Sequence, residues 1–326
     1  MGERGLVDFF LCRITNLSSR EKVLLAQRCE SEADFAALSR IDVELLVGHV
    51  LRGAAWDKDA LARQAEADAT AAHRRGISWV SYQDACYPPL LRETWDPPVM
   101  LFYRGVMPNP EKPLLAIVGT REPSEAGRRE AYTLARDFAR AGVVVISGLA
   151  LGVDAMAHRG NIEGGAPTVA VLGSGLDRVY PTGNRALARR IVEQGGALLS
   201  EYPPGSGPEK WHFPARNRII SALARGTLII EAPERSGALI TARFALEQGR
   251  DLWVSACGLA APRGQGVRKL HDDGAPCVSS ARDILTDWGL AGSDSETSKP
   301  ALMFSPSSLA ASLAASLYIP AGERAL

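Results

Sequence analysis

Several signatures that mark common enzyme classes are missing from this 326-residue sequence. There is no GxxxxGK[ST] loop, which argues against a P-loop nucleotidase, and no GxGxxG after the first predicted strand, which makes a complete dinucleotide site doubtful. HExxH, GxSxG and Cys/His ligand clusters are also absent. The sequence therefore predicts no metal site, no cofactor and no catalytic residue.

Net charge, paired cysteines and long apolar runs are lacking too. Basic and acidic residues each number 37, so no chain-wide field attracts nucleic acid or membrane, and any basic surface must be local. No apolar run approaches a membrane span, and no secretory core follows the charged N-terminus. We therefore expect a cytoplasmic protein without a membrane partner. Five scattered cysteines without a CxxC pair suit a reducing compartment: Cys12, Cys29, Cys86, Cys257 and Cys277.

The clearest fold signal is a repeated strand, loop and helix near the middle of the chain. Leu114–Val118 and Val143–Ile146 are short apolar runs of the kind that is buried on both faces of a parallel sheet. A glycine-bearing loop follows each run, and Ser124 and Asp154 are predicted to cap the helices that come next. Loops of this kind lie at the carboxyl edge of a sheet, where amides and helix N-termini hold anions.

Strands and helices alternate at this rhythm to about residue 285. The alternation predicts an α/β fold with an extended Rossmann-like, mostly parallel, doubly wound sheet over residues 76–290, which includes an edge strand at Ile77–Tyr82 near its start. Residues 1–75 predict a small all-helical domain, either a helical cap or a module for DNA or a protein partner. Residues 291–326 are predicted to be a linker and a disordered tail.

Arg121 lies where the first apolar run ends and would point toward the crevice above the sheet. A ligand contact and a plain salt bridge both fit this position. Asp154 and His158 are four residues apart and share one helical face. They fit a catalytic base and its orienting group, but a cap and a structural histidine fit better, because no nucleophile lies at a defined spacing.

The stretch Trp211–Arg218 combines aromatic rings with cations, and Glu209 is the only acid between residues 206 and 225. Aromatic and basic side chains together form stacking platforms and phosphate contacts for single-stranded nucleic acid. The alternative is a lid loop whose Phe213 packs on the sheet. The cations in and beside this stretch are Lys210, Arg216, Arg218 and Arg225.

Six motifs occur in an order and spacing that match one known family. They are IVGTREPS (117–124), SGLALGVDAMAH (147–158), AVLGSGLDRVYPTGN (170–184), ALLSEYPPG (197–205), FPARNRIISAL (213–223) and EAPERSGALITARFALEQGR (231–250). Over about residues 77–285 the chain resembles the DprA family of DNA-processing proteins, also called Smf. The N-terminal helices resemble the SAM-like domain of many members.

The resemblance implies a single-stranded DNA-binding protein, usually a homodimer, without known catalysis. It also implies loading of the RecA recombinase onto incoming DNA in natural transformation and recombination. By motif position, Arg121 would contact DNA from the GTR loop, and Arg216 and Arg218 would do so from the RNR segment. The expected DNA-binding residues are Gly119, Thr120, Arg121, Ser124, Ser147, Gly148, Lys210, Phe213, Arg216, Asn217 and Arg218.

Three features depart from the family pattern. Leu151 stands where many members have arginine, so one basic contact is in doubt. Ser255–Gly258 replaces a VPG-like turn, and Arg268 stands where asparagine is common. Many members end in a winged-helix domain, for which residues 291–326 are too short and too rich in serine and alanine.

Two other functions remain open from the sequence. The predicted sheet distantly resembles nucleotide hydrolases of the lysine-decarboxylase-like group, in which Glu231 and Glu201 would act as acid or base on an N-glycosidic bond. That group carries a PGGxGT-type loop, whereas residues 233–241 read PERSGALIT. The third possibility is a scaffold or partner adaptor whose loops are only structural.

Overall fold

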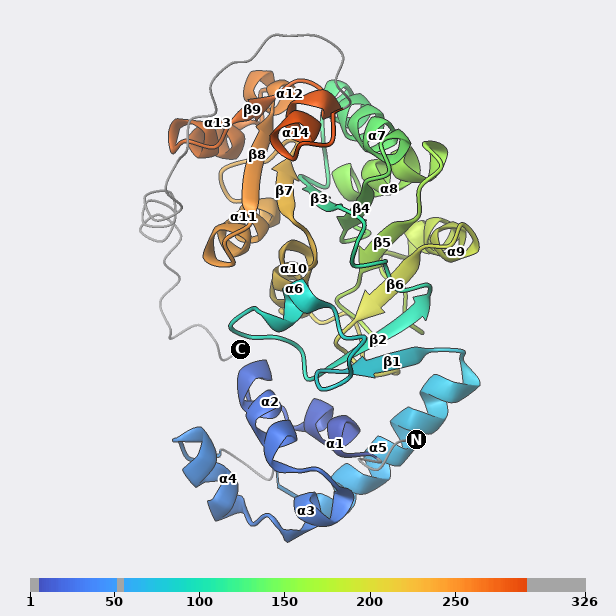
Figure 1. The fold of residues 1–326 in the computed structure, drawn as a ribbon, viewed down its shortest axis with the longest axis vertical. Coiled ribbons are helices and arrows are strands. Elements are labelled where there is room, and N and C mark those ends of the chain that lie inside the picture. Colours follow the sequence, from blue (N-terminus) through green and yellow to red (C-terminus); the bar gives the residue numbers. More distant parts are fainter. Residues whose placement is uncertain (1–5, 52–55, 292–326) are drawn as a thin grey trace. The chain divides into compact units, whose positions relative to one another are not determined.

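The computed structural model describes residues 6–51 and 56–291 (Figure 1). These residues divide into two compact units. The first unit holds the described residues up to 111 together with residues 169–219, and the second holds residues 112–168 and 220–291. The predicted tail, residues 292–326, lies outside the described residues. The predicted domain limits at 75 and 290 stay a prediction.

The N-terminal part of the first unit is helical, as the sequence predicts. Three of its helices start with a serine whose hydroxyl and an acidic side chain three residues later cap each other, as Ser18 and Glu21 do. Phe9 packs edge-on against Trp79, at 5.0 Å between ring centroids, and against Phe102, so these helices join the strands of the unit. The helices are α1 (Val7–Arg13), α2 (Ser19–Arg28), α3 (Glu32–Ala37), α4 (Arg40–Val47) and α5 (Lys58–Arg74).

The strands of the first unit follow the order β1-β2-β6-β5. Strands β5 and β6 are parallel, whereas β2 runs antiparallel to both β1 and β6. The strands are β1 (Ser78–Ser81), β2 (Met100–Gly105), β5 (Thr168–Val171) and β6 (Ala197–Ser200). The helices are α6 (Pro89–Arg92), the short η1 (Thr182–Asn184), α9 (Arg185–Glu193) and α10 (His212–Leu223), whose last residues belong to the second unit.

The second unit holds five strands in the order β4-β3-β7-β8-β9. Its recorded strand pairs are parallel, because a helix returns the chain between strands. The strands are β3 (Leu114–Val118), β4 (Val144–Ser147), β7 (Gly226–Ile229), β8 (Asp251–Ser255) and β9 (Cys277–Val278). The helices are α7 (Glu125–Arg140), α8 (Val153–Glu163), α11 (Gly237–Glu247), α12 (Ala256–Ala260), α13 (Gln265–Asp272) and α14 (Ala281–Asp287).

Apolar side chains from α7, α8 and α14 form one buried cluster with the strands of the second unit, including Phe138, Ile117 and Trp253. Helix α11 packs on β7 and β8 with residues outside that cluster. Parallel strands with helices on both faces confirm the predicted Rossmann-like, doubly wound fold and its helical N-terminal region. The sequence patterns did not predict the short segments α6, η1, β9, α12 and α13, because two to eight residues are too few to show a clear period.

Candidate nucleic-acid interface

The loop between β3 and α7 is held by a buried carboxylate. Ser124 caps α7, as predicted, by accepting a hydrogen bond from the Gly127 amide at 3.0 Å. The amide and hydroxyl of Ser124 both donate to Glu231 Oε2, at 3.0 and 2.8 Å. The Thr120 amide donates to the Glu231 carbonyl oxygen at 2.7 Å. Glu231 therefore fixes the loop that carries Arg121, and its carboxylate is committed to this contact.

Arg121 is exposed at the tip of this loop, which lies against the start of α8. A Cβ atom at Gly152 would come within 2.6 Å of the Arg121 carbonyl oxygen, and Gly152 has a φ of 80° that favours glycine. A Cβ at Gly119 would lie 2.6 Å from Val153 Cγ2. Gly152 lets the loops after β3 and β4 pack backbone to backbone, and Gly119 leaves room for the Val153 side chain. This packing directs the Arg121 side chain outward.

The loop after β4 is largely buried, whereas the sequence predicts a loop whose amides are available to hold an anion. The Ser147 hydroxyl donates to the Ile117 carbonyl at 2.6 Å, and Asp154 Oδ2 accepts hydrogen bonds from the amides of Gly148 and Ala150, at 3.1 and 3.3 Å. Gly152 rather than Asp154 is the N-cap of α8, which corrects that prediction. Ser147 and Gly148 were expected to contact DNA, but both are buried, and their hydrogen bonds hold the loop in its conformation.

Leu149 in the same loop is buried and has a φ of 59°, a left-handed conformation that costs a leucine about 1–2 kcal/mol. The amides on either side of it donate to the Asp154 carboxylate, and these bonds hold the conformation. The next side chain, Leu151, is 51% exposed. The loop therefore presents an apolar side chain where the family resemblance expects an arginine.

His158 has a structural role. The Thr168 hydroxyl donates its one proton to the Val145 carbonyl at 2.7 Å. Its oxygen can therefore only accept a hydrogen bond from His158 Nδ1, which lies 2.8 Å away. This assigns the proton to Nδ1 in the fully buried ring. Asp154 and His158 thus serve the loop and β4, as the structural interpretation of their spacing expected.

A cluster of aromatic rings forms at the start of α10 in the first unit. The His212 ring stacks on Tyr202 at 3.7 Å between centroids, and Trp211 packs edge-on against His212 at 4.0 Å. His212 Nδ1 donates to the carbonyls of Gly173 and Gly207, each at 3.1 Å. Burial lowers the pKa of His212, so the ring is a neutral anchor for the cluster.

Two rings of this region are open to solvent. Trp211 is 64% exposed and Tyr180 is 43% exposed, and Tyr180 lies 5.4 Å from the half-buried Phe213. Lys210 is exposed directly before Trp211. We name the exposed or half-buried residues Tyr180, Lys210, Trp211 and Phe213 the aromatic platform. Its members combine solvent-exposed aromatic side chains with a cation.

Arg216 departs from its expected role as a surface contact. Its side chain is only 5% exposed, donates to the Val171 carbonyl at the end of β5, and lies 3.2 Å from Asn217 Oδ1 through Nε. Because α10 begins at His212 rather than near Ala215, Arg216 lies one turn inside the helix, against the strand. It ties α10 to the sheet, while Asn217 is half-buried.

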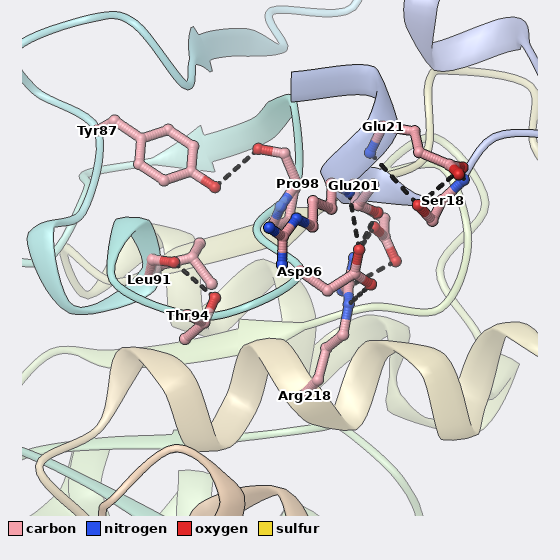
Figure 2. A network of polar contacts seen from close by, with 11 residues as sticks. Ser18, Glu21, Tyr87, Leu91, Thr94, Asp96, Pro98, Glu201 and Arg218 are labelled. Atoms are coloured by element: carbon pink, nitrogen blue, oxygen red, sulfur yellow. Dashed lines mark hydrogen bonds and ion pairs between the residues drawn. The ribbon is translucent and has the colours of Figure 1, made fainter. Parts of the chain in front are cut away.

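Arg218 departs from the expectation more strongly, since it is 8% exposed and lies inside an ion-pair network (Figure 2). Its guanidinium is 2.6 Å from Glu201 Oε2 and 3.2 Å from Asp96 Oδ2, and it donates to the Ser19 hydroxyl at 2.8 Å. Burial lowers the pKa of Arg218, but the two carboxylates raise it by more, so the group stays charged. The network joins α10 to α2.

Asp96 extends this network to the first turn of α2. Its second oxygen, Oδ1, accepts a hydrogen bond from the Arg20 amide at 2.8 Å, beside the Ser18 cap. The carboxylate thus satisfies a helix N-terminus and a buried arginine together. Glu201, the other proposed catalytic acid, is committed to Arg218 in the same way as Glu231 is to Ser124.

Trp211 and Tyr180 are not among the expected DNA-binding residues, although Trp211 lies in the stretch of aromatic and basic residues and Tyr180 in one of the family motifs. The structure singles them out by exposure, which a pattern of residue types does not report. Among the described residues, no three His, Cys, Asp or Glu side chains are arranged to hold a metal ion. No helix in the described part of the chain is both long and apolar enough to cross a bilayer.

Comparison with known proteins identifies the family. Residues 78–289 match the family model described as DNA recombination-mediator protein A. The chain is 40% identical over 219 residues to the DNA processing protein DprA of Bacillus subtilis, which covers 67% of this chain and 73% of that protein. It is 40% identical over 208 residues to DprA of Streptococcus pneumoniae, covering 64% and 73% of the two chains.

Solved structures agree with this relationship. The X-ray structure of DprA from Streptococcus pneumoniae matches with a TM-score of 0.71 and 32% identity, over 87% of this chain and 98% of that one. DNA processing protein A from Helicobacter pylori, whose structure concerns its single-stranded DNA binding mode, matches with a TM-score of 0.59 and 30% identity, over 65% and 95%. The chain belongs to the DprA/Smf family of DNA-processing proteins.

Proposed function

We propose that this protein binds single-stranded DNA through the aromatic platform of the first unit, and that Arg121 of the second unit makes a separate phosphate contact. The observation that carries the proposal is the exposure of Trp211 and Tyr180 beside Lys210 in a chain whose total charge is zero. Exposed rings stack on bases of any sequence, and a few local cations suffice to contact phosphates. The single-stranded DNA binding mode described for the Helicobacter pylori relative supports the same ligand class.

The remaining predicted contact residues have supporting roles in this proposal. Gly119, Thr120 and Ser124 set the loop that presents Arg121, and Asn217 is half-buried in α10. Arg216 and Arg218 hold α10 in place from the inside. The DNA contacts are therefore made by fewer cations than the family motifs suggest.

The further steps rest on family membership. The protein delivers the bound strand to the RecA recombinase during natural transformation and recombination, acts as a homodimer, and works in the cytoplasm without catalysing a reaction. The alternative of a nucleotide hydrolase loses support, because the carboxylates of Glu201 and Glu231 both accept structural hydrogen bonds. Incubation with AMP and related nucleotides, followed by product analysis, tests the hydrolase directly, and release of a free base would revive it.

A salt-titrated binding assay tests the proposal. Single-stranded DNA should bind more tightly than duplex of the same sequence, and log K should fall linearly with log salt. Lys210→Ala and Arg121→Ala should each weaken binding and reduce the salt slope by about 0.7 per lost phosphate contact. Arg140→Ala, which removes an exposed arginine at the far end of α7, is the matched control.

The outcomes of this assay separate the candidate functions. Equal affinity for single strand and duplex, or slopes unchanged in both variants with the fold intact, would refute the assigned site. Absence of any DNA binding by the wild-type protein would favour the scaffold or adaptor function.

A further inference from the structure

Helix α5 presents two faces of different character. Its buried face is the stripe Leu61, Ala65, Asp68 and Ala72, and Asp68 is fixed by two contacts of 2.6 Å from Arg13 of α1. The opposite face, at the same spacing, begins with Arg63 and ends with Arg74. The outward face is therefore held in place by a rigid inner contact.

Between these arginines the outward face of α5 is a shallow groove. The groove has a volume of about 460 Å³, and the side chains between the arginines are mostly small. Three arginines and a single acid line it, so its charge is positive. The lining residues are Arg63, Glu66, Ala67, Thr70, Ala71, Arg74 and Arg75.

A chain of contacts connects this groove to the loops beside the aromatic platform, within the first unit. Arg75 Nε lies 3.7 Å from Asp177 Oδ2, in the loop between β5 and α9. Asp177 Oδ1 accepts a hydrogen bond from the Gly205 amide at 2.9 Å, in the loop between β6 and α10. Arg178, which follows Asp177 in the chain, is exposed, and Tyr180 of the platform comes two residues after it.

The charges along this line favour an anionic partner. Arg63, Arg74 and Arg178 are exposed, while Arg75 shares its charge with Asp177 and also donates to the Ala71 carbonyl at 3.4 Å. Glu66 is the opposing acid in the groove. One face of α5 and the adjoining loop thus carry more positive than negative charge, in a molecule that is neutral overall.

We infer that the α5 groove is an extension of the DNA site, where Arg63 and Arg74 contact phosphates of a single strand that leaves the aromatic platform past Arg178. This inference rests on the proposed function and adds a second, sequence-independent part to it. The two arginines are eleven residues apart, so about 16 Å of helix separates them, a span of several nucleotides. The N-terminal helical region then has a direct part in holding DNA.

The test compares a short oligonucleotide of about 6 nucleotides, which fills only the platform, with one of about 20 nucleotides that reaches α5. The double variant Arg63→Gln/Arg74→Gln removes both exposed charges and leaves the Arg75–Asp177 pair intact. We expect unchanged affinity for the short oligonucleotide. For the long one we expect a loss on the order of tenfold at low salt and a salt slope lower by about 1.4, which corresponds to two phosphates.

The control is Arg140→Gln/Arg159→Gln, which removes two exposed arginines from α7 and α8 of the second unit. Urea unfolding of all variants checks that the fold is kept. The inference is overturned if the α5 variant binds the long oligonucleotide like the wild type, if it loses equal affinity for both lengths, or if the control shows the same loss. A wild-type protein that binds neither oligonucleotide would instead overturn the proposed function itself.

Discussion

The two halves of the stretch 210–218 carry the same kinds of residues but have opposite surroundings. In the first half, Lys210 and Trp211 are exposed at the start of α10. In the second half, one or two turns along, Arg216 and Arg218 are almost completely buried against β5 and α2. An arginine in a motif that the family resemblance assigns to DNA contact can therefore be buried and serve the fold instead.

The difference follows from where the helix begins. With His212 as the first residue of α10, the side chains before it emerge from the helix end, while those at 216 and 218 face neighbouring elements. Pro214 is tolerated because the first turn of a helix needs no amide donor there. A helix that began at Ala215 would instead have placed Arg216 in its first turn.

The largest expected effect is on stability, and it comes from removing the buried Arg218. Arg218→Ala leaves the carboxylates of Glu201 and Asp96 without their cation, and such a loss in a buried network costs about 3 kcal/mol or more of unfolding free energy. Urea unfolding measures it, with Arg140→Ala as the exposed control. A loss below about 1 kcal/mol would show that the network contributes little.

The second effect is on binding rather than stability. Trp211→Ala removes an exposed ring and should reduce single-stranded DNA affinity by about 1–3 kcal/mol, with little change in the unfolding free energy. Trp95→Ala is the matched control, since Trp95 is also exposed in the first unit but lies under the Arg20 guanidinium. Equal losses in the two variants would remove the reason for assigning Trp211 to the platform.

The third effect depends on pH and concerns the anchor of the platform. Because burial lowers the pKa of His212, the unfolded chain takes up a proton below about pH 6.5 that the folded protein resists. This group therefore makes stability fall as the pH drops below that value, by at most about 1.4 kcal/mol per pH unit.

Urea unfolding at several pH values, comparing the wild type with His212→Gln, isolates this contribution. The variant should lose part of the acid sensitivity. The comparison is needed because His49 acts in the opposite direction, its pKa being raised by the hydrogen bond with Glu21. Identical pH profiles for the two proteins would contradict the neutral-anchor role of His212.

The smallest expected effect concerns Leu151, an exposed residue of the second unit. Leu151→Arg places a cation on an exposed loop position where the family resemblance expects one. It should raise single-stranded DNA affinity a few-fold at low salt and increase the salt slope by about 0.7, without changing stability. Leu151→Gln serves as the uncharged control, and a gain of the same size in that variant would exclude a phosphate contact.

The sequence by itself determined the order of the longer strands and helices, several caps such as Ser124, and the family. Apolar runs and helical periods are local patterns, so they can be recognised without knowing which residues lie nearby in space. The tertiary structure alone decided which motif residues reach the surface. The Arg218 network joins residues 19, 96, 201 and 218, and no local pattern reports that such distant positions will meet. Burial then made Arg218 a structural cation, because its charge is already matched inside the protein.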